Sequence, residues 1–110
     1  EAEFWETLEK FVASRSIVID RPKRSTHPRY PEVKYPLDYG YLNDTISTDG
    51  AGIDLWSGSK NLRNIDGILV TIDLQKTDIE IKLLIGCSGD ELGEICKFQN
   101  SGEMNSKIDK

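Results

Sequence analysis

Two aspartates near the middle of the chain have the residue type and spacing to bind a divalent cation. Asp49 and Asp54 follow a tyrosine-rich segment, 35–41, and the glycines between them lead from a turn into a short strand. Hard cations such as Mg2+ need oxygen ligands and keep several waters, so two or three carboxylates plus phosphate oxygens form a site. Glu80, on the polar face of a later strand, is the third candidate ligand. The alternative is that all three are solvated strand and turn carboxylates, since Asp-Gly is a common turn pair.

A group of basic residues in a Pro-rich stretch has the charge to bind an anion. It consists of Arg21, Lys23, Arg24 and Arg29, with the single histidine, His27, among them. Arginine can hold a phosphate through two parallel N–H bonds, whereas lysine acts as a mobile point charge. The chain as a whole has a net charge of -5. The group therefore suits an anionic substrate, unless its cations pair with neighbouring carboxylates in a solvated loop.

Lys82 is a further candidate because of its place on a strand. Side chains two residues apart point to the same face, so Lys82 shares a face with Glu80 and Asp78. An exposed salt bridge is the simplest alternative. Such a pair is worth only ~0–1 kcal/mol, so stability alone gives little reason for this arrangement.

Several other kinds of site and partner are excluded. The segment 49–53 lacks the alternating acidic ligands of a calcium loop, and no Gly-Lys-Ser/Thr sequence marks a P-loop. Two cysteines, Cys87 and Cys96, are too few for a disulfide scaffold, and we expect reduced thiols. The negative charge argues against nucleic-acid binding, and no apolar run approaches the about 20 residues of a membrane span. We therefore expect a cytoplasmic protein with no nucleic-acid or membrane partner.

Helical elements are expected at both ends of the chain. Apolar residues at helical spacing predict an amphipathic helix over residues 1–14. A capping box at 88–91 predicts a second helix that ends near residue 99. The polar composition that follows predicts a flexible tail over 101–110. A length of 110 residues predicts a single domain, 1–110, with one modest core.

Strands and one long loop are expected between the helices. Residues 17–19 predict a short strand, and the Pro- and Arg-rich residues 21–36 a long surface loop of the kind that often carries function. Alternation of period two predicts strands over 68–75 and 78–83, joined as a hairpin by a turn at 76–77. We expect one face of this hairpin to be core and one to be polar.

The central segment resembles the active-site core of the soluble (family I) inorganic pyrophosphatases. In that family a Tyr-Pro-x-x-Tyr-Gly-Tyr segment precedes an Asp-x-Asp-x-x-Asp cluster, and here the matching residues are Tyr35-Pro36-Leu37-Asp38-Tyr39-Gly40-Tyr41, Asp49 and Asp54. Glu80-Ile81-Lys82 is similar to the acid-x-lysine strand that follows in the family. The resemblance covers about residues 18 to 85. It implies a mainly β (α+β) fold, a small closed OB-like Greek-key β-barrel with an N-terminal and a C-terminal helix.

The resemblance also implies a function, Mg2+-dependent hydrolysis of pyrophosphate to two phosphates by a metal-activated water. The roles that it implies are metal binding for Asp49, Asp54 and Glu80, catalysis for Asp54 and Lys82, and substrate binding for Lys23, Arg29, Tyr39 and Lys82. Whether Asp73 or Asp78 completes the ligand set stays open.

One departure from the family pattern limits this conclusion. Ala51 occupies the place of the second metal-binding acid. The alternative is therefore a pyrophosphatase-fold protein that binds metal-phosphate or a nucleotide without efficient turnover. A third interpretation is a homo-oligomer, suggested by the aromatic residues Phe4, Trp5 and Trp56 in a chain short of core.

Overall fold

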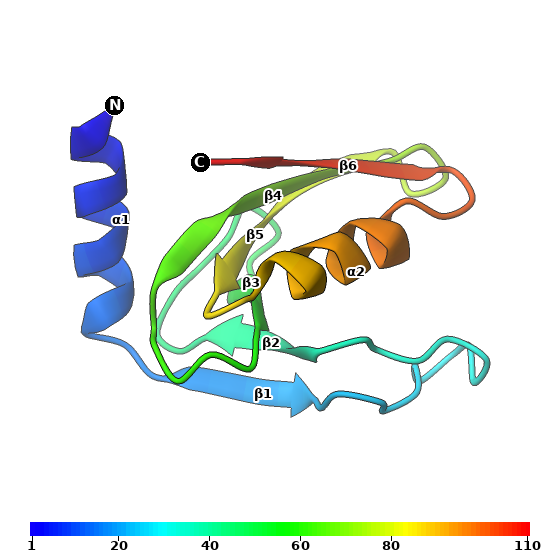
Figure 1. The fold of residues 1–110 in the computed structure, drawn as a ribbon. Coiled ribbons are helices and arrows are strands. Elements are labelled where there is room, and N and C mark those ends of the chain that lie inside the picture. The colour runs from blue at the N-terminus through cyan, green and yellow to red at the C-terminus, as the bar shows by residue number, and fades with distance from the viewer.

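The computed structural model describes residues 1–110 and consists of two helices and one six-stranded sheet (Figure 1). The helices are α1 (Ala2–Ala13) and α2 (Gly89–Gln99). The strands are β1 (Ile17–Arg21), β2 (Asp38–Leu42), β3 (Ile53–Ser57), β4 (Ile65–Asp73), β5 (Asp78–Ile85) and β6 (Met104–Asp109). Neither helix combines the length and the apolar composition needed to cross a membrane.

The sheet is open, with the strand order β1-β2-β3-β5-β4-β6. All neighbours are antiparallel except β3 and β5, which run parallel. The closed barrel expected from the resemblance is not formed, because β1 and β6 are the two edges and do not pair with each other. β1 is followed by Pro22, which has no N–H for a further ladder bond. The strands curve around α2 instead of meeting (Figure 1).

Two apolar cores lie on opposite faces of the sheet. The core beside α1 contains Val12, Leu42, Leu55, Ile65, Leu83 and Ile85. The core beside α2 contains Tyr35, Leu37, Trp56, Leu69, Leu84, Cys87 and Ile95. Side chains alternate along a strand, so Asp54 shares the α2 side with Trp56, and Lys82 shares it with Leu84.

The β4–β5 hairpin confirms the expected alternation, but the expectation that its polar face lies opposite the core is wrong. On β4 the residues that point to the α2 side, Leu69, Thr71 and Asp73, are buried. The apolar residues of the other face, Ile72, Ile79 and Ile81, are 47%, 65% and 56% exposed. The polar face of the hairpin is therefore the inner one, because α2 covers that side of the sheet.

The segment expected to be a flexible tail contains strand β6. It pairs antiparallel with β4 from Ile68↔Asp109 to Asp73↔Met104. Ile108 packs against the α2 core, and Ser106 Oγ donates to Asn100 Oδ1 at 2.8 Å. The sequence did not predict this strand because it contains few apolar residues. An edge strand can be held mainly by backbone hydrogen bonds.

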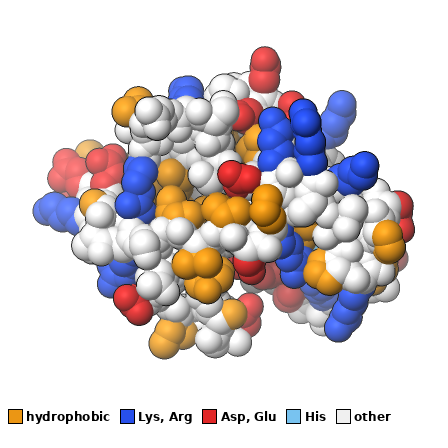
Figure 2. Space-filling model, turned by 90° about the horizontal axis from the view of Figure 1, so that it is seen from below, with side chains coloured by type: hydrophobic (Ala, Val, Ile, Leu, Met, Phe, Trp, Pro, Cys, Tyr) orange, Lys and Arg blue, Asp and Glu red, His pale blue; other side chains and the backbone are white.

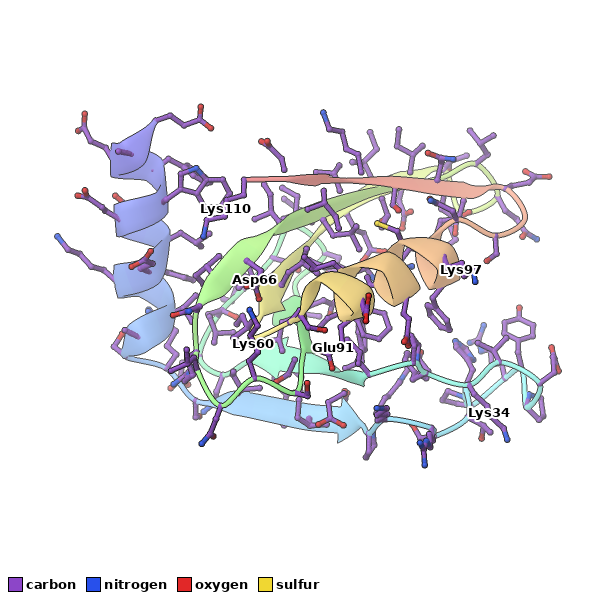
Figure 3. The ribbon with its side chains drawn as sticks, in the orientation of Figure 1. Lys34, Lys60, Asp66, Glu91, Lys97 and Lys110 are labelled. Atoms are coloured by element: carbon purple, nitrogen blue, oxygen red, sulfur yellow. The ribbon has the colours of Figure 1, made fainter.

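The predicted capping box at the start of α2 is confirmed. Glu91 N donates to Ser88 Oγ at 3.2 Å, and Ser88 N donates to Glu91 Oε1 at 2.8 Å. Glu91 also accepts from Ser59 N, at 3.2 Å to each carboxylate oxygen. Nearby, Asp66 Oδ2 accepts from Cys87 N at 2.6 Å. These two carboxylates (Figure 3) fix the start of the β3–β4 loop and the loop that leads from β5 to α2.

Candidate active site

A cavity of about 1020 Å3 lies on the α2 side of the sheet. One wall consists of the inner faces of β2, β3 and β5 together with the segment between β1 and β2. The opposite wall consists of the end of α2 and the turn that leads into β6. In Figure 1 the end of α2, the turn into β6 and the segment between β1 and β2 lie toward the right-hand end of the molecule. Of the residues predicted from the sequence, Asp54, Lys82, Glu80, Tyr39 and Arg29 line this cavity.

Asp54 and Lys82 are brought together by the parallel pairing of β3 and β5. The register aligns Leu55 with Leu83, and one residue earlier on each strand it places Asp54 beside Lys82. Tyr39 comes from β2, where it is aligned with Trp56 of β3. Lys82 Nζ donates to Tyr39 Oη at 2.7 Å and lies 4.8 Å from the centre of the tyrosine ring. Three neighbouring strands of the sheet thus bring one carboxylate, one amine and one phenol together.

The pKa shifts of these three groups all favour the uncharged form of the side chain. Burial lowers the pKa of Lys82, despite the attraction of Glu80 and Asp54. Burial raises the pKa of Asp54, despite the attraction of Lys82 and a hydrogen bond with Tyr39. Burial, followed by repulsion from Asp54, raises the pKa of Tyr39, so its hydroxyl keeps its proton at neutral pH. The charges in this site are therefore held at a cost in free energy, as is common where a protein binds charged ligands.

Glu80 and Asp78 lie on the same inner strand face as Lys82. Glu80 is aligned with Thr71 of β4 and lines the cavity. Asp78 does not line it, but its Oδ1 is buried and accepts no hydrogen bond. Asp73 is aligned with Asp78, and its Oδ1 is used by the hairpin turn, where it accepts from Gln75 N and Lys76 N, both at 3.0 Å. The sequence left open whether Asp73 or Asp78 is a metal ligand. Asp78 has an oxygen without a hydrogen bond but does not line the cavity, whereas Asp73 lines the cavity.

Asp49 lies outside the cavity lining, in the exposed turn before β3. Its Oδ1 accepts from Ser47 Oγ at 2.5 Å and from Ala51 N at 2.9 Å. The hydrogen bonds from Ser47 and Ala51 lower the pKa of Asp49. The structure therefore gives this carboxylate a turn-forming role, and its predicted metal-binding role stays a prediction.

The side chains of the cavity supply few ligands for the Mg2+ ion that the resemblance implies. No group of three or more His, Cys, Asp or Glu side chains is arranged to hold a metal ion. Of the three predicted metal ligands, Asp54 and Glu80 line the cavity; its other carboxylates are Asp20, Glu32, Asp73 and Glu103. Mg2+ is usually bound by one or two carboxylates together with substrate phosphates, not by an all-protein cage. The residues thus fit a cation shared with a phosphate ligand, and they do not fit one held by the protein alone.

Basic side chains line the cavity on several sides. They are Arg21, Arg29, Lys34, Lys76, Lys82 and Lys97. Lys23 is not among them; its backbone N–H donates to Asp38 Oδ1 at 2.8 Å. Figure 2 shows Lys and Arg side chains gathered at the right-hand end of the molecule, where the 22–37 segment lies.

Sequence reasoning missed Lys34, Lys76 and Lys97 as cavity residues. Lys34 and Lys97 lie on opposite sides of the gap between the 22–37 segment and the end of α2 (Figure 3). Nothing in the sequence marks Lys97, which occupies the last turn of a helix, where a cation is ordinary. Arg21 was identified only as part of the basic group, and it donates a hydrogen bond to the Tyr35 hydroxyl.

The sequence matches no family model and no curated protein, whereas the fold matches solved structures. The inorganic pyrophosphatase from Helicobacter pylori aligns with a TM-score of 0.58 and 16% identity, over 84% of this chain and 80% of its own. An inorganic pyrophosphatase from Coxiella burnetii aligns with a TM-score of 0.56 and 15% identity, over 84% and 81%. A structure described as an inorganic phosphatase from Anaplasma phagocytophilum gives 0.56 and 16%, over 84% and 80%. The chain therefore has the inorganic pyrophosphatase fold, in a strongly divergent sequence.

Proposed function

We propose that the protein is a Mg2+-dependent inorganic diphosphatase that hydrolyses pyrophosphate to two phosphates. The observation that carries the proposal is the convergence of Asp54, Lys82, Tyr39 and Glu80 from three strands in one cavity. The basic side chains on its walls suit an anionic substrate. The fold shared with inorganic pyrophosphatases supports the same reaction. The cytoplasmic location predicted from the sequence is part of the proposal.

The proposed mechanism needs no covalent intermediate, because positioning and charge neutralisation supply most of the acceleration of phosphoryl transfer. Lys82 Nζ and the Tyr39 hydroxyl bind oxygens of the phosphate that leaves, and Arg29 steadies the other end of the anion. Asp54 accepts a proton from the attacking water at a carboxylate oxygen. Asp54 and Glu80 would hold Mg2+, which when bound supplies a water of lowered pKa and neutralises phosphate charge.

The test is phosphate release from pyrophosphate in the presence and absence of Mg2+. Replacing Asp54 with Asn should lower the rate by about 10^2–10^4-fold, the usual contribution of a positioned acid or base. Lys82→Met should lower it by about 10^2–10^3-fold, as expected for the loss of one electrostatic contact to the transition state. Matched controls are Lys107→Met and Asp109→Asn, which change exposed charges on β6. Equal rates in all variants would contradict the proposal.

A second candidate function is supported by the turn that precedes β3. Asp49 is hydrogen-bonded within its own turn and Ala51 has no carboxylate, so two of the three acids expected there are not directed at the cavity. This observation favours a protein that binds metal-phosphate or a nucleotide without efficient turnover. In that case pyrophosphate with Mg2+ raises the melting temperature of the wild type by mass action, but releases no phosphate above the Asp54→Asn background.

A further inference from the structure

The cavity is several times larger than pyrophosphate requires. Pyrophosphate has nine non-hydrogen atoms, and at roughly the volume of one water each it fills about 270 Å3. The cavity of about 1020 Å3 is at the upper end of the range for pockets that bind organic ligands. Its outer part, beyond Asp54 and Lys82, therefore has room for a group attached to the phosphates.

Aromatic rings extend from the phosphate end of the cavity toward its mouth. Tyr39, Tyr35, His27 and Tyr30 follow one another with ring-centre distances of 5.5, 6.3 and 5.1 Å. All four line the cavity. The series begins at a hydroxyl bonded to Lys82 and ends at Tyr30, whose side chain is 54% exposed. The exposed ring is thus three ring-to-ring steps from the amine proposed to bind phosphate.

The rings at the mouth are carried by a braced loop. His27 N donates to Val33 O at 2.9 Å and Val33 N donates to Tyr30 O at 2.9 Å, so the loop forms a small hairpin. His27 Nδ1 accepts from Arg29 N at 3.0 Å, which leaves a neutral ring with its proton on Nε2. Burial, followed by repulsion from Arg21 and other cations, lowers the pKa of His27 and favours this neutral form. A neutral, fixed ring beside an exposed tyrosine can stack with another aromatic group.

We propose that the ligand of this cavity is a nucleoside diphosphate whose base stacks on Tyr30 and His27 while its phosphates lie near Lys82. The ring series supplies a stacking surface at the right end of the cavity, and bases stack on aromatic side chains with little dependence on sequence or base type. Lys34 and Lys97, on the two sides of the mouth, suit the sugar-phosphate between these ends (Figure 3). This inference rests on the proposed function, because it places the phosphates in the same inner site.

Binding of two non-hydrolysable probes in Mg2+, measured by calorimetry, tests the inference. The probes are methylenediphosphonate, which has only the phosphate end, and α,β-methylene adenosine diphosphate, which adds the nucleoside. Wild type should bind the nucleotide probe about 10-fold more tightly, within the range known for base stacking. Tyr30→Leu should abolish the preference and Tyr30→Phe should keep it. Phe4→Leu is the matched control, since Phe4 is 51% exposed on α1 and does not line the cavity.

Each outcome separates this inference from the proposed function. A preference for the nucleotide probe that is lost only in Tyr30→Leu supports the inference. Equal affinities for the two probes, or a preference that survives Tyr30→Leu, overturn it, and pyrophosphate hydrolysis by the same preparation would leave the proposed function standing. If neither probe binds and no phosphate is released from pyrophosphate, both proposals fail.

Discussion

The Asp54–Lys82 pair should reduce the stability of the protein while serving its function. In both groups burial moves the pKa away from the charged form more strongly than the partner's attraction moves it back. Replacing a buried ion pair with uncharged side chains of similar shape is often neutral or stabilising by about 1–4 kcal/mol. Asp54 is only partly buried, so we expect the lower part of this range, about 1–2 kcal/mol, for the double variant Asp54→Asn/Lys82→Met.

Each single replacement should behave differently from the double one. Lys82→Met leaves Asp54 in the cavity without its cation, and Asp54→Asn leaves Lys82 without a neighbouring carboxylate. Groups in contact show coupling energies of about 0.5–3 kcal/mol, so the two single effects should not add up to that of the double variant. Phosphate release should be near background in all three variants, because the proposed mechanism uses both groups.

The pH dependence of unfolding gives a second signature of the same pair. The folded pKa of Lys82 is lowered, so between that value and 10.5 the unfolded chain binds more protons and stability rises with pH. The folded pKa of Asp54 is raised, so between 3.8 and that value the folded chain binds more protons and stability falls as pH rises. The double variant should lose both slopes.

Urea denaturation of the wild type, both single variants and the double variant measures these effects. Lys107→Met/Asp109→Asn is the matched control, because it changes the same two residue types on the exposed face of β6. Surface replacements of this kind usually stay within about 0.5 kcal/mol. A double variant at Asp54 and Lys82 that is less stable than wild type by about 1 kcal/mol or more would refute the argument that burial outweighs attraction.

Three further predictions concern the scaffold of the site and use the same denaturation assay. Glu91→Gln should lower the free energy of unfolding by about 1.5–3 kcal/mol, since charge-assisted hydrogen bonds to two loops are lost. Because the folded pKa of Glu91 is lowered, the wild type loses this stabilisation as pH falls below 4.5. A difference in stability that does not change with pH would contradict this prediction. Gly40→Ala should destabilise by more than about 1 kcal/mol, because a Cβ there overlaps the Val18 carbonyl, and an unchanged midpoint would refute the close β1–β2 approach. Ile108→Ala should cost about 1–3 kcal/mol through lost packing, and a change below about 0.3 kcal/mol would show that β6 does not dock.

Local features of the fold could be predicted from the sequence because their causes are local. The helical spacing of apolar residues predicted α1, and the Ser88–Glu91 capping box predicted the start of α2. The alternation that predicted the β4–β5 hairpin was equally informative, but the expectation that its core face lies opposite its polar face was wrong. Both faces of β4 carry apolar side chains, and only the positions of α1 and α2 decide that Leu69 is buried while Ile72 is exposed.

The features that sequence reasoning missed depend on contacts between distant segments. The parallel pairing of β3 with β5 follows neither from the spacing of the strands nor from their composition, yet this pairing sets Asp54 beside Lys82. Strand β6 has few apolar residues and is held by its ladder with β4. Lys34 and Lys97 become neighbours of one cavity only when α2 lies against the 22–37 segment.

The acidic turn shows why spacing alone is a weak guide to a metal site. Matching the intervals of an Asp-x-Asp-x-x-Asp cluster places Asp49 within reach of the site, but a carboxylate is directed by the donors around it. At Asp49 those donors are Ser47 Oγ and Ala51 N, within its own turn. Asp54 has no such local donors; its neighbour is Lys82, across a strand pairing. Of the three predicted metal ligands, the two that tertiary pairing places in the cavity are Asp54 and Glu80, and a cation between them would depend on phosphate oxygens for further ligands.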